Sequence, residues 1–301
     1  MMAAPAHEPS DIAVERRDTA LGSWTVARWS PPPASPLHDV VEQIWYFDGT
    51  LALARERVFP DGRAELIVQL DQPHRDGGSA SLDSFPAVCI NGLRTRPSVV
   101  VAPKGRCRVL GIRFDPAGVY SILQASPQEL VDVTIDLHDG IGRSAAELGE
   151  RCAGAAETSA WNPARNAAAA VLAAQRWLLQ RTGREPVADS AIAWTAAMIR
   201  NANGVISVGG LGEHLALSRT RLAQRFLERT GVTPKRFARI VRFHNALSLL
   251  GRSENIASTA AETGYYDQAH MYRDFAEFAR MTPGEFLAAT RYPNSASVAE
   301  R

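Results

Sequence analysis

The sequence predicts an α+β protein: a mostly β N-terminal domain, a helical connector, and an all-α C-terminal domain with two helix-turn-helix units joined by a long helix. Three observations support this prediction. Apolar and polar residues alternate in short runs through the first part of the chain, and the composition becomes Ala-rich after Arg143. The twenty residues that begin at Ser218 recur forty-nine positions later, beginning at Asp267.

We expect the sensor- or dimerisation-type β domain to span residues 1–142 and the helical connector to span 143–203. The C-terminal domain is expected over 204–291, with 292–301 as a frayed tail. A chain of 301 residues with 46% hydrophobic content is long enough for two domains of ordinary size, each with its own core.

The N-terminal part reads as strands separated by Gly, Pro, Asn and Asp. Strands are expected in WTVARW, VVEQIWYFDGT, ERVFPDGRAELIVQL, FPAVCING, PSVVVA and RVLGIRF. The period of a half-buried strand is clearest in Ala64, Leu66, Val68 and Leu70. Asp115 and Pro116 then open a helix, and Ser126 with Glu129 has the spacing of a capping box. The β domain therefore has a short helical finish.

The connector reads as two helices. Asn162 and Pro163 begin the first, which runs to Gly183. Pro186 begins the second, which ends near Gly204.

The repeat defines the helices of the C-terminal domain. Ser218 and Asp267 are residues that cap a helix, and each is followed by an apolar pair four positions apart, then by Thr-Pro at the next helix start. The expected helices are Val208 to Leu215, Ser218 to Thr230, Pro234 to Leu250 closed by Gly251, Ile256 to Thr263, Asp267 to Ala279, and Pro283 to Thr290. Leu222, Phe226, Met271, Phe275, Phe237 and Phe286 are the expected core.

The positive charge of the chain is concentrated in one segment. The net charge is only +1, but Arg219 to Arg242 holds eight basic residues and one acid, a net +7. A basic patch on a near-neutral protein favours a dedicated nucleic-acid surface.

Other features exclude several classes of protein. The three cysteines lack metal-ligand spacing and indicate a reducing compartment, so we expect a cytoplasmic protein. No apolar run approaches the roughly 18 residues of a membrane span, and the N-terminus lacks the pattern of a secretory signal. Asp61 with Glu65 is the best acid-base pair, but no nucleophile motif, metal spacing or phosphate loop accompanies it. We expect no enzyme activity, metal or cofactor.

Several motifs resemble the AraC/XylS-type transcription regulators. They are LSRTRLAQRF, GVTPKRF, ALSLL and GYYDQAHMYRDFAEF followed by MTPGEF, and the resemblance covers Ile206 to Ala289. It implies a regulator that places two recognition helices in adjacent major grooves of double-stranded DNA. RNA polymerase is a further implied partner, and the position of the bound site would decide between activation and repression.

The segments VEQIWYFDG, PDGRAELIV and LGIRFDPAGVYSILQ resemble the N-terminal domain of one subgroup of the same family. This second resemblance implies sensing of a small-molecule effector or formation of a homodimer. The aromatic residues Trp45, Tyr46, Phe47, Phe59 and Phe114 either line a pocket for an apolar effector or form the β core. The alternative function is a ligand- or protein-binding receptor with only weak DNA affinity.

The polar faces of the two predicted recognition helices supply the candidate DNA-binding residues. They are Arg219, Thr220, Arg221, Gln224 and Arg225 in the first unit, and Gln268, Ala269, His270, Tyr272 and Arg273 in the second. Arg273 suits a guanine edge and either Gln suits adenine. We assign Arg219, Arg221, Arg225 and Lys235 to phosphates. The first unit is therefore expected mainly to anchor and the second mainly to read.

Two departures from the family pattern bear on these expectations. Gly209, Gly210 and Gly212 weaken the helix before the first recognition helix. Arg280 stands where the family usually has Gly, and this puts the turn after the second recognition helix in question.

Overall fold

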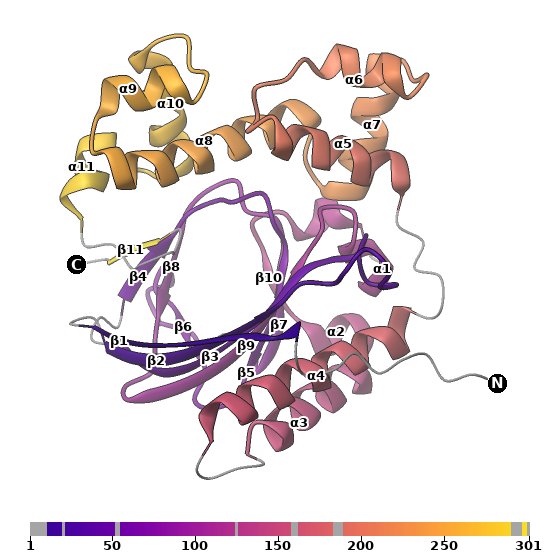
Figure 1. Ribbon diagram of the computed structural model, residues 1–301, viewed down its shortest axis with the longest axis vertical. Coiled ribbons are helices and arrows are strands. Elements are labelled where there is room, and N and C mark those ends of the chain that lie inside the picture. Colours follow the sequence, from indigo (N-terminus) through magenta and orange to yellow (C-terminus); the bar gives the residue numbers. More distant parts are fainter. Residues whose placement is uncertain are drawn as a thin grey trace.

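The computed structural model describes residues 11–19, 22–51, 55–123, 126–157, 162–182, 189–289 and 297–299. The predicted fold class is confirmed, because a β-rich N-terminal part is followed by a helical C-terminal part (Figure 1). The second connector helix is expected to begin at Pro186, which lies outside the described ranges; the helix observed there begins at Ser190, with Asp189 as its N-cap.

A seven-stranded antiparallel sheet forms the centre of the N-terminal domain. Its order is β1 (Ala13–Thr19), β2 (Gly22–Trp29), β3 (Val41–Leu51), β9 (Arg106–Phe114), β5 (Glu65–Gln69), β7 (Val88–Asn91) and β10 (Thr134–Asp136). The edge strands β1 and β10 lie outside the predicted segments. β1 consists largely of exposed and charged residues. Such residues protect a sheet edge from pairing with another strand. They also lack the alternation of apolar residues from which a strand is predicted.

A four-stranded sheet, with the order β11 (Ser297–Ala299), β4 (Arg55–Val58), β8 (Ser98–Val101) and β6 (Arg75–Asp76), joins residues 297–299 to the N-terminal domain. β11 pairs antiparallel with β4, and Val298 is buried. The prediction of a frayed tail is therefore wrong at 297–299. The partner strand lies more than two hundred residues away, so no local pattern could indicate this pairing.

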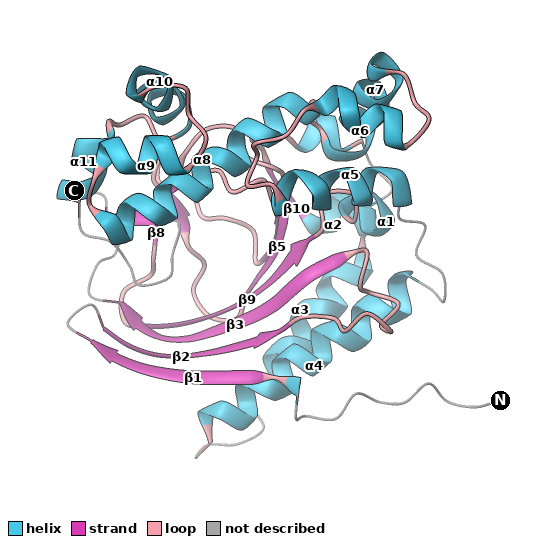
Figure 2. Cartoon of the chain, turned by 45° about the horizontal axis from the view of Figure 1, so that its top comes forward, coloured by secondary structure: helices cyan, strands magenta, loops and turns pink. Residues whose placement is uncertain are grey.

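Helices follow the strands of the N-terminal domain: the short α1 (Val119–Leu123), the 3-10 turn η2 (Pro127–Leu130) and the short α2 (Leu137–Ile141), then the longer α3 (Arg143–Ala155) and α4 (Pro163–Thr182). The predicted capping box is wrong, because Ser126 makes no side-chain cap hydrogen bond to η2. α3 and α4 cover the outer side of the sheet, on the opposite side from the C-terminal helices (Figures 1 and 2).

The C-terminal helices are α5 (Ser190–Asn201), α6 (Val208–His214), α7 (Arg219–Thr230), α8 (Pro234–Ser253), α9 (Ile256–Glu262), α10 (Gln268–Phe278) and α11 (Pro283–Ala288). Their existence and order match the expected helices. α8 does not stop at Gly251, because Glu254 adopts the left-handed conformation that ends it (φ 53°).

Two hydrophobic cores lie side by side. The first combines the seven-stranded sheet with α3 and α4, and the second combines α5 to α11 with Phe59, Leu93 and Ala117 of the N-terminal domain. The predicted connector is thus shared, since α4 packs in the first core and α5 in the second. No helix within the described ranges combines the length and apolar character needed to cross a membrane.

Candidate nucleic-acid interface

Two helix-turn-helix units are mounted on the long helix α8. Figure 1 shows α8 lying across the open side of the curved sheet, with α6 and α7 at one end and α9, α10 and α11 at the other. α7 is the second helix of the first unit, and α10 is the second helix of the second unit. In each unit this is the helix that would enter a major groove.

The predicted caps are present in both units. The Arg221 backbone N–H donates to Ser218 Oγ over 3.2 Å, and the His270 backbone N–H donates to Asp267 Oδ1 over 2.6 Å. Below the caps, the apolar stripes predicted from the repeat are fully buried: Leu222 and Phe226 in α7, Met271 and Phe275 in α10. Burial of these stripes turns the opposite face of each helix towards solvent.

Most of the candidate DNA-binding residues lie on these outward faces. The exposed ones in α7 and α10 are Arg219, Thr220, Arg221, Gln224, Gln268, Ala269, Tyr272 and Arg273, and Lys235 is exposed in the first turn of α8. Arg225 and His270 are only partly exposed. The structure therefore brings the first set to two solvent-facing surfaces and places the other two residues at the edges of those surfaces.

The basic segment is less positive than its composition indicates. Five of its eight cations form ion pairs within the protein: Arg225 and Arg229 with Asp189, Arg236 with Glu277, Arg239 with Asp274 and Glu277, and Arg242 with Asp274. The sequence count of +7 overstates the surface charge, because the compensating acids lie outside the segment. Arg219, Arg221 and Lys235 make no ion pair with any residue the structure describes.

Arg225 holds α7 to the start of α5. Its Nε and Nη2 donate to the two carboxylate oxygens of Asp189 over 2.6 and 2.8 Å, and the Asp189 side chain is only 6% exposed. Arg229 lies 4.4 Å above the ring of Tyr120 in the N-terminal domain. These two arginines are therefore engaged in holding the first unit in place.

Asp274 holds α10 to α8. This carboxylate is 1% exposed and accepts from Arg239 Nη2 over 2.7 Å and from Arg242 Nη2 over 3.1 Å. Arg242 lies 4.4 Å over the ring of Tyr265 and donates to His270. The position in α10 that corresponds to Arg225 in α7 thus carries the opposite charge and performs a similar positioning role.

The two departures from the family pattern have different structural outcomes. A Cβ on Gly210 would meet nothing within 4 Å, but one on Gly212 would stand 2.8 Å from the Leu217 carbonyl oxygen. Gly212 therefore permits close packing of the turn, and Gly210 does not. Arg280 has a φ of 54°, whereas the equivalent Gly231 has a φ of 83°. The second unit makes its left-handed turn without glycine.

One exposed aromatic residue was missed by sequence reasoning. Tyr265 is buried at 5% exposure, whereas its neighbour Tyr266 is 94% exposed. Tyr266 immediately precedes the Asp267 cap, so it stands beside the first turn of α10. The sequence does not distinguish these two neighbouring tyrosines. The structure does, because one side chain is buried and the other is exposed.

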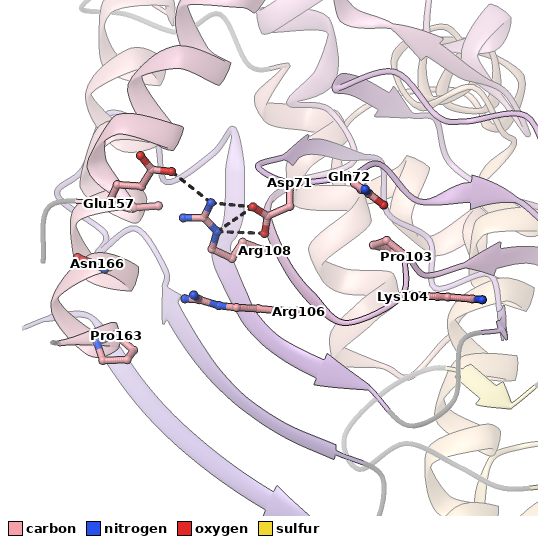
Figure 3. A pocket seen from close by; sticks show the side chains of 10 residues that line it. Asp71, Gln72, Pro103, Lys104, Arg106, Arg108, Glu157, Pro163 and Asn166 are labelled. Atoms are coloured by element: carbon pink, nitrogen blue, oxygen red, sulfur yellow. Dashed lines mark hydrogen bonds and ion pairs between the residues drawn. The ribbon is translucent and has the colours of Figure 1, made fainter. Parts of the chain in front are cut away.

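The aromatic residues considered for an effector pocket do not line one common cavity. Tyr46 and Phe114 are fully buried in the first core, and Phe59 is buried in the second. A different hollow of about 520 Å³ lies between the sheet and α4 (Figure 3). Its lining is polar, with Arg108 paired to Asp71 over 2.7 Å and to Glu157 over 3.3 Å. Tyr46, Phe59 and Phe114 thus follow the second of the two alternatives, since they form part of the cores, and the hollow is lined mainly by polar and charged residues.

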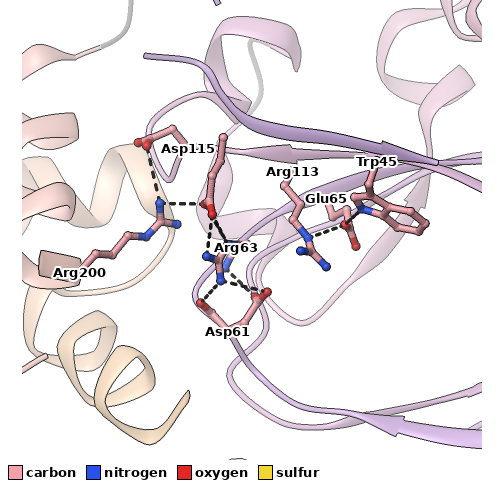
Figure 4. A network of polar contacts seen from close by, with 8 residues as sticks. Trp45, Asp61, Arg63, Glu65, Arg113, Asp115 and Arg200 are labelled. Atoms are coloured by element: carbon pink, nitrogen blue, oxygen red, sulfur yellow. Dashed lines mark hydrogen bonds and ion pairs between the residues drawn. The ribbon is translucent and has the colours of Figure 1, made fainter. Parts of the chain in front are cut away.

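A network of charged side chains joins the N-terminal domain to α5 (Figure 4). Arg200 Nη1 lies 3.0 Å from Glu42 and 3.7 Å from Asp115. Arg63 pairs with Glu42 over 2.6 Å and with Asp61 over 3.4 Å. Burial raises the pKa of Asp115 to about 6, against the opposing charge of Arg200. This network ties the two cores together through charges of both signs.

The candidate acid-base pair also belongs to this charged region. Asp61 is paired with Arg63, and Glu65 accepts from Trp45 Nε1 over 2.5 Å and from Arg113 Nε over 3.0 Å. Each carboxylate is therefore held by structural partners. Among the described residues, no group of three or more His, Cys, Asp and Glu side chains could hold a metal ion.

Two family models match the chain. Residues 211–289 match a helix-turn-helix domain, and residues 30–136 match a domain of unknown function (DUF6597). Fold and match together define a double helix-turn-helix module on a β-rich partner domain. The C-terminal match bears out the resemblance to AraC-family regulators for the helix-turn-helix units. DNA-binding transcription regulation is the class of function that this domain supports.

Solved structures give further similarities. ToxT from Vibrio cholerae O395 is 14% identical, with 78% of this chain and 95% of that chain covered and a TM-score of 0.43. A probable AraC family transcriptional regulator from Rhodopseudomonas palustris CGA009 is 24% identical, with 33% and 96% covered and a TM-score of 0.31. Unsaturated fatty acid bound ToxT from Vibrio cholerae strain SCE256 is 14% identical, with 90% and 96% covered and a TM-score of 0.42. No curated protein matches the sequence.

Proposed function

We propose that the chain is a sequence-specific transcription regulator that places α7 and α10 in adjacent major grooves of double-stranded DNA. One observation carries this proposal: two capped helices, each with a buried apolar stripe and an exposed polar face, are mounted on the single helix α8. A recognition helix meets base edges with its N-terminal residues, and adjacent grooves on one side of DNA repeat every 34–36 Å or so.

Residue chemistry assigns the roles within this proposal. Arg219, Arg221 and Lys235 are exposed and lack an internal ion pair in the described chain, so they neutralise phosphates. Thr220 and Gln224 offer the first unit its contacts with bases. Arg225 is reassigned from phosphate contact to positioning, because its donors are held by Asp189.

In the second unit, Arg273 grips a guanine edge and Gln268 an adenine edge, each discriminating by about 1–3 kcal/mol. Ala269 meets a thymine methyl group, and the exposed Tyr272 adds to the contact surface. Tyr266 joins this set, since its 94% exposure leaves both ring faces and the hydroxyl free to meet the DNA backbone.

The N-terminal domain has a regulatory role in this proposal. It contacts α7 through Tyr120 and Arg229, and it contacts the end of α10 where Arg57 Nη1 donates to the Ala279 carbonyl over 3.2 Å. A domain that touches both units can transmit the binding of a small-molecule effector or of a second copy of the chain. RNA polymerase is the partner through which the bound regulator acts.

The second candidate function is a ligand- or protein-binding receptor with weak DNA affinity. The neutralisation of five of the eight cations in the basic segment favours it. Unbiased selection from random duplex DNA with the purified full chain separates the two functions. The regulator enriches one sequence motif. Recovery of DNA without an enriched motif would contradict the regulator and support the receptor.

A further inference from the structure

His270 is held in a defined orientation in the first turn of α10. Arg242 Nη2 of α8 lies 3.1 Å from His270 Nε2. A guanidinium group has donors and no acceptor, so Arg242 must donate and Nε2 must supply the lone pair. A neutral imidazole with its lone pair on Nε2 carries its proton on Nδ1. The contact with Arg242 therefore defines the tautomer of His270.

The surroundings of Arg242 keep this contact in place. The same Nη2 donates to Asp274 Oδ2 over 3.1 Å, and the guanidinium lies 4.4 Å over the ring of Tyr265. The Tyr265 ring in turn meets the imidazole edge to face, with 5.1 Å between ring centroids and 86° between ring planes. Both Tyr265 and Asp274 are buried. A ring flip of His270 would replace the accepting nitrogen with a C–H group facing Arg242.

The imidazole is neutral in this setting. Burial and the positive charge of Arg242 lower the pKa of His270, while Asp274 opposes them to a smaller extent. Arg273 and Asp267, on the same helix and at its cap, act in opposite directions and complete the charged groups that face the ring. The lone pair on Nε2 therefore remains available to Arg242 at neutral pH.

His270 Nδ1 makes no hydrogen bond to any residue within the described ranges, and it lies on the proposed reading helix. We infer that His270 uses Nδ1–H to read a hydrogen-bond acceptor on a base edge, and that Arg242 is the positioning residue that fixes this donor. In the major groove, purine N7, guanine O6 and thymine O4 accept, whereas cytosine offers only an amino donor. His270 therefore discriminates against cytosine. This inference rests on the proposed function.

The tautomer can be tested without DNA. Long-range proton–nitrogen NMR spectra of the full chain, with ¹⁵N-labelled histidine, distinguish the two neutral forms. The His270 signals are assigned by their loss in His270→Gln. We expect Nδ1–H in the native chain and a mixture of tautomers in Arg242→Gln, because an amide both donates and accepts. Nε2–H or an imidazolium in the native chain would overturn the inference. The tautomer of the native chain is read without Arg242→Gln, so misfolding of that variant would not affect the result.

The reading role is tested with selected DNA. His270→Ala is expected to lose about fivefold in affinity for the enriched motif and to accept cytosine at one position that the native chain rejects. Lys235→Ala is the control and weakens binding to every sequence alike. An unchanged preference at all positions in His270→Ala would overturn the reading role alone. Failure of the native chain to enrich any motif would overturn the proposed function, while the NMR result would still stand or fall separately.

Discussion

Single residues at equivalent positions of the repeat carry different chemistry. Gln224 in α7 corresponds to Arg273 in α10, and Arg221 corresponds to His270. Arg225 corresponds to Asp274, and both form ion pairs that hold their helices against neighbouring helices. The first unit thus presents unpaired cations, whereas the second presents groups that suit base edges. This asymmetry supports anchoring by α7 and reading by α10, which stay predictions.

Arg273→Ala tests whether Arg273 contacts a base edge. Binding titrations at several salt concentrations are expected to show a loss of about 1–3 kcal/mol on the enriched motif and a relaxed preference at one base pair. Lys235→Ala is expected to weaken all sequences and to lower the salt slope by about one. If Arg273→Ala changed only the salt slope, Arg273 would be a phosphate contact.

The positions of side chains could be predicted where local chemistry decides them. The caps Ser218 and Asp267 and the buried pair Leu222 and Phe226 follow from spacing along one helix. The ion pairs could not be predicted, because Asp189 lies 36 residues from Arg225. A count of charges in a segment cannot include acids brought to it by folding.

At the scale of elements, α6 is a weak helix for two separate reasons. Gly210 adds backbone entropy to the unfolded chain without any packing benefit, since the space around it is open. Gly212 also lowers the helix propensity, but it lets the Leu217 carbonyl approach the helix. In the first helix-turn-helix unit, Gly210 therefore lowers stability without a packing benefit, whereas Gly212 is required by the packing of the turn.

Gly210→Ala and Gly212→Ala form a matched pair that separates these reasons. Gly210→Ala is expected to raise the free energy of unfolding by about 0.5–1 kcal/mol. Gly212→Ala is expected to lower it, because the new methyl group would be 2.8 Å from a carbonyl oxygen. Urea unfolding of both variants, followed by far-ultraviolet circular dichroism, measures the difference. Equal stabilisation by both substitutions would show that the Leu217 turn is not tightly packed against α6.

At the scale of the whole molecule, the N-terminal domain is fastened to both helix-turn-helix units. Tyr120 lies under Arg229 at the end of α7, and Arg57 donates to carbonyls at the end of α10. Between these contacts, Arg200 joins α5 to Glu42 and Asp115. Such contacts fix the orientation of α7 and α10 relative to the N-terminal domain. These contacts join residues that are far apart in the sequence. The helices could therefore be predicted from the sequence, but their contacts with the N-terminal domain could not.

The charged network gives the fastening a pH dependence. Burial raises the pKa of Asp115 from an ordinary 3.8 to about 6, so the folded chain holds this proton more tightly than the unfolded chain. The contribution of this protonated carboxyl group to the free energy of unfolding is full below about pH 4 and is lost as pH rises through about 6. Asp115→Asn is therefore expected to raise the free energy of unfolding by about 2 kcal/mol at pH 7.5, with a much smaller effect at pH 4.

Chemical unfolding of the native chain and Asp115→Asn across this pH range measures the difference. Taking the difference between the two proteins removes the contribution of carboxylates they share. A stabilisation that grows as pH falls would contradict the assignment of the buried proton to Asp115.

The central claim is that one chain places α7 and α10 in adjacent major grooves. Methylation interference at guanine N7 on the selected motif measures this most directly, since N7 lies in the major groove. If α7 and α10 lie in adjacent major grooves, we expect two interfering segments on one face of the duplex, centred about 10–10.5 base pairs apart. Arg273→Ala should weaken the pattern in only one of them. A single interfering segment, unchanged by Arg273→Ala, would contradict the claim.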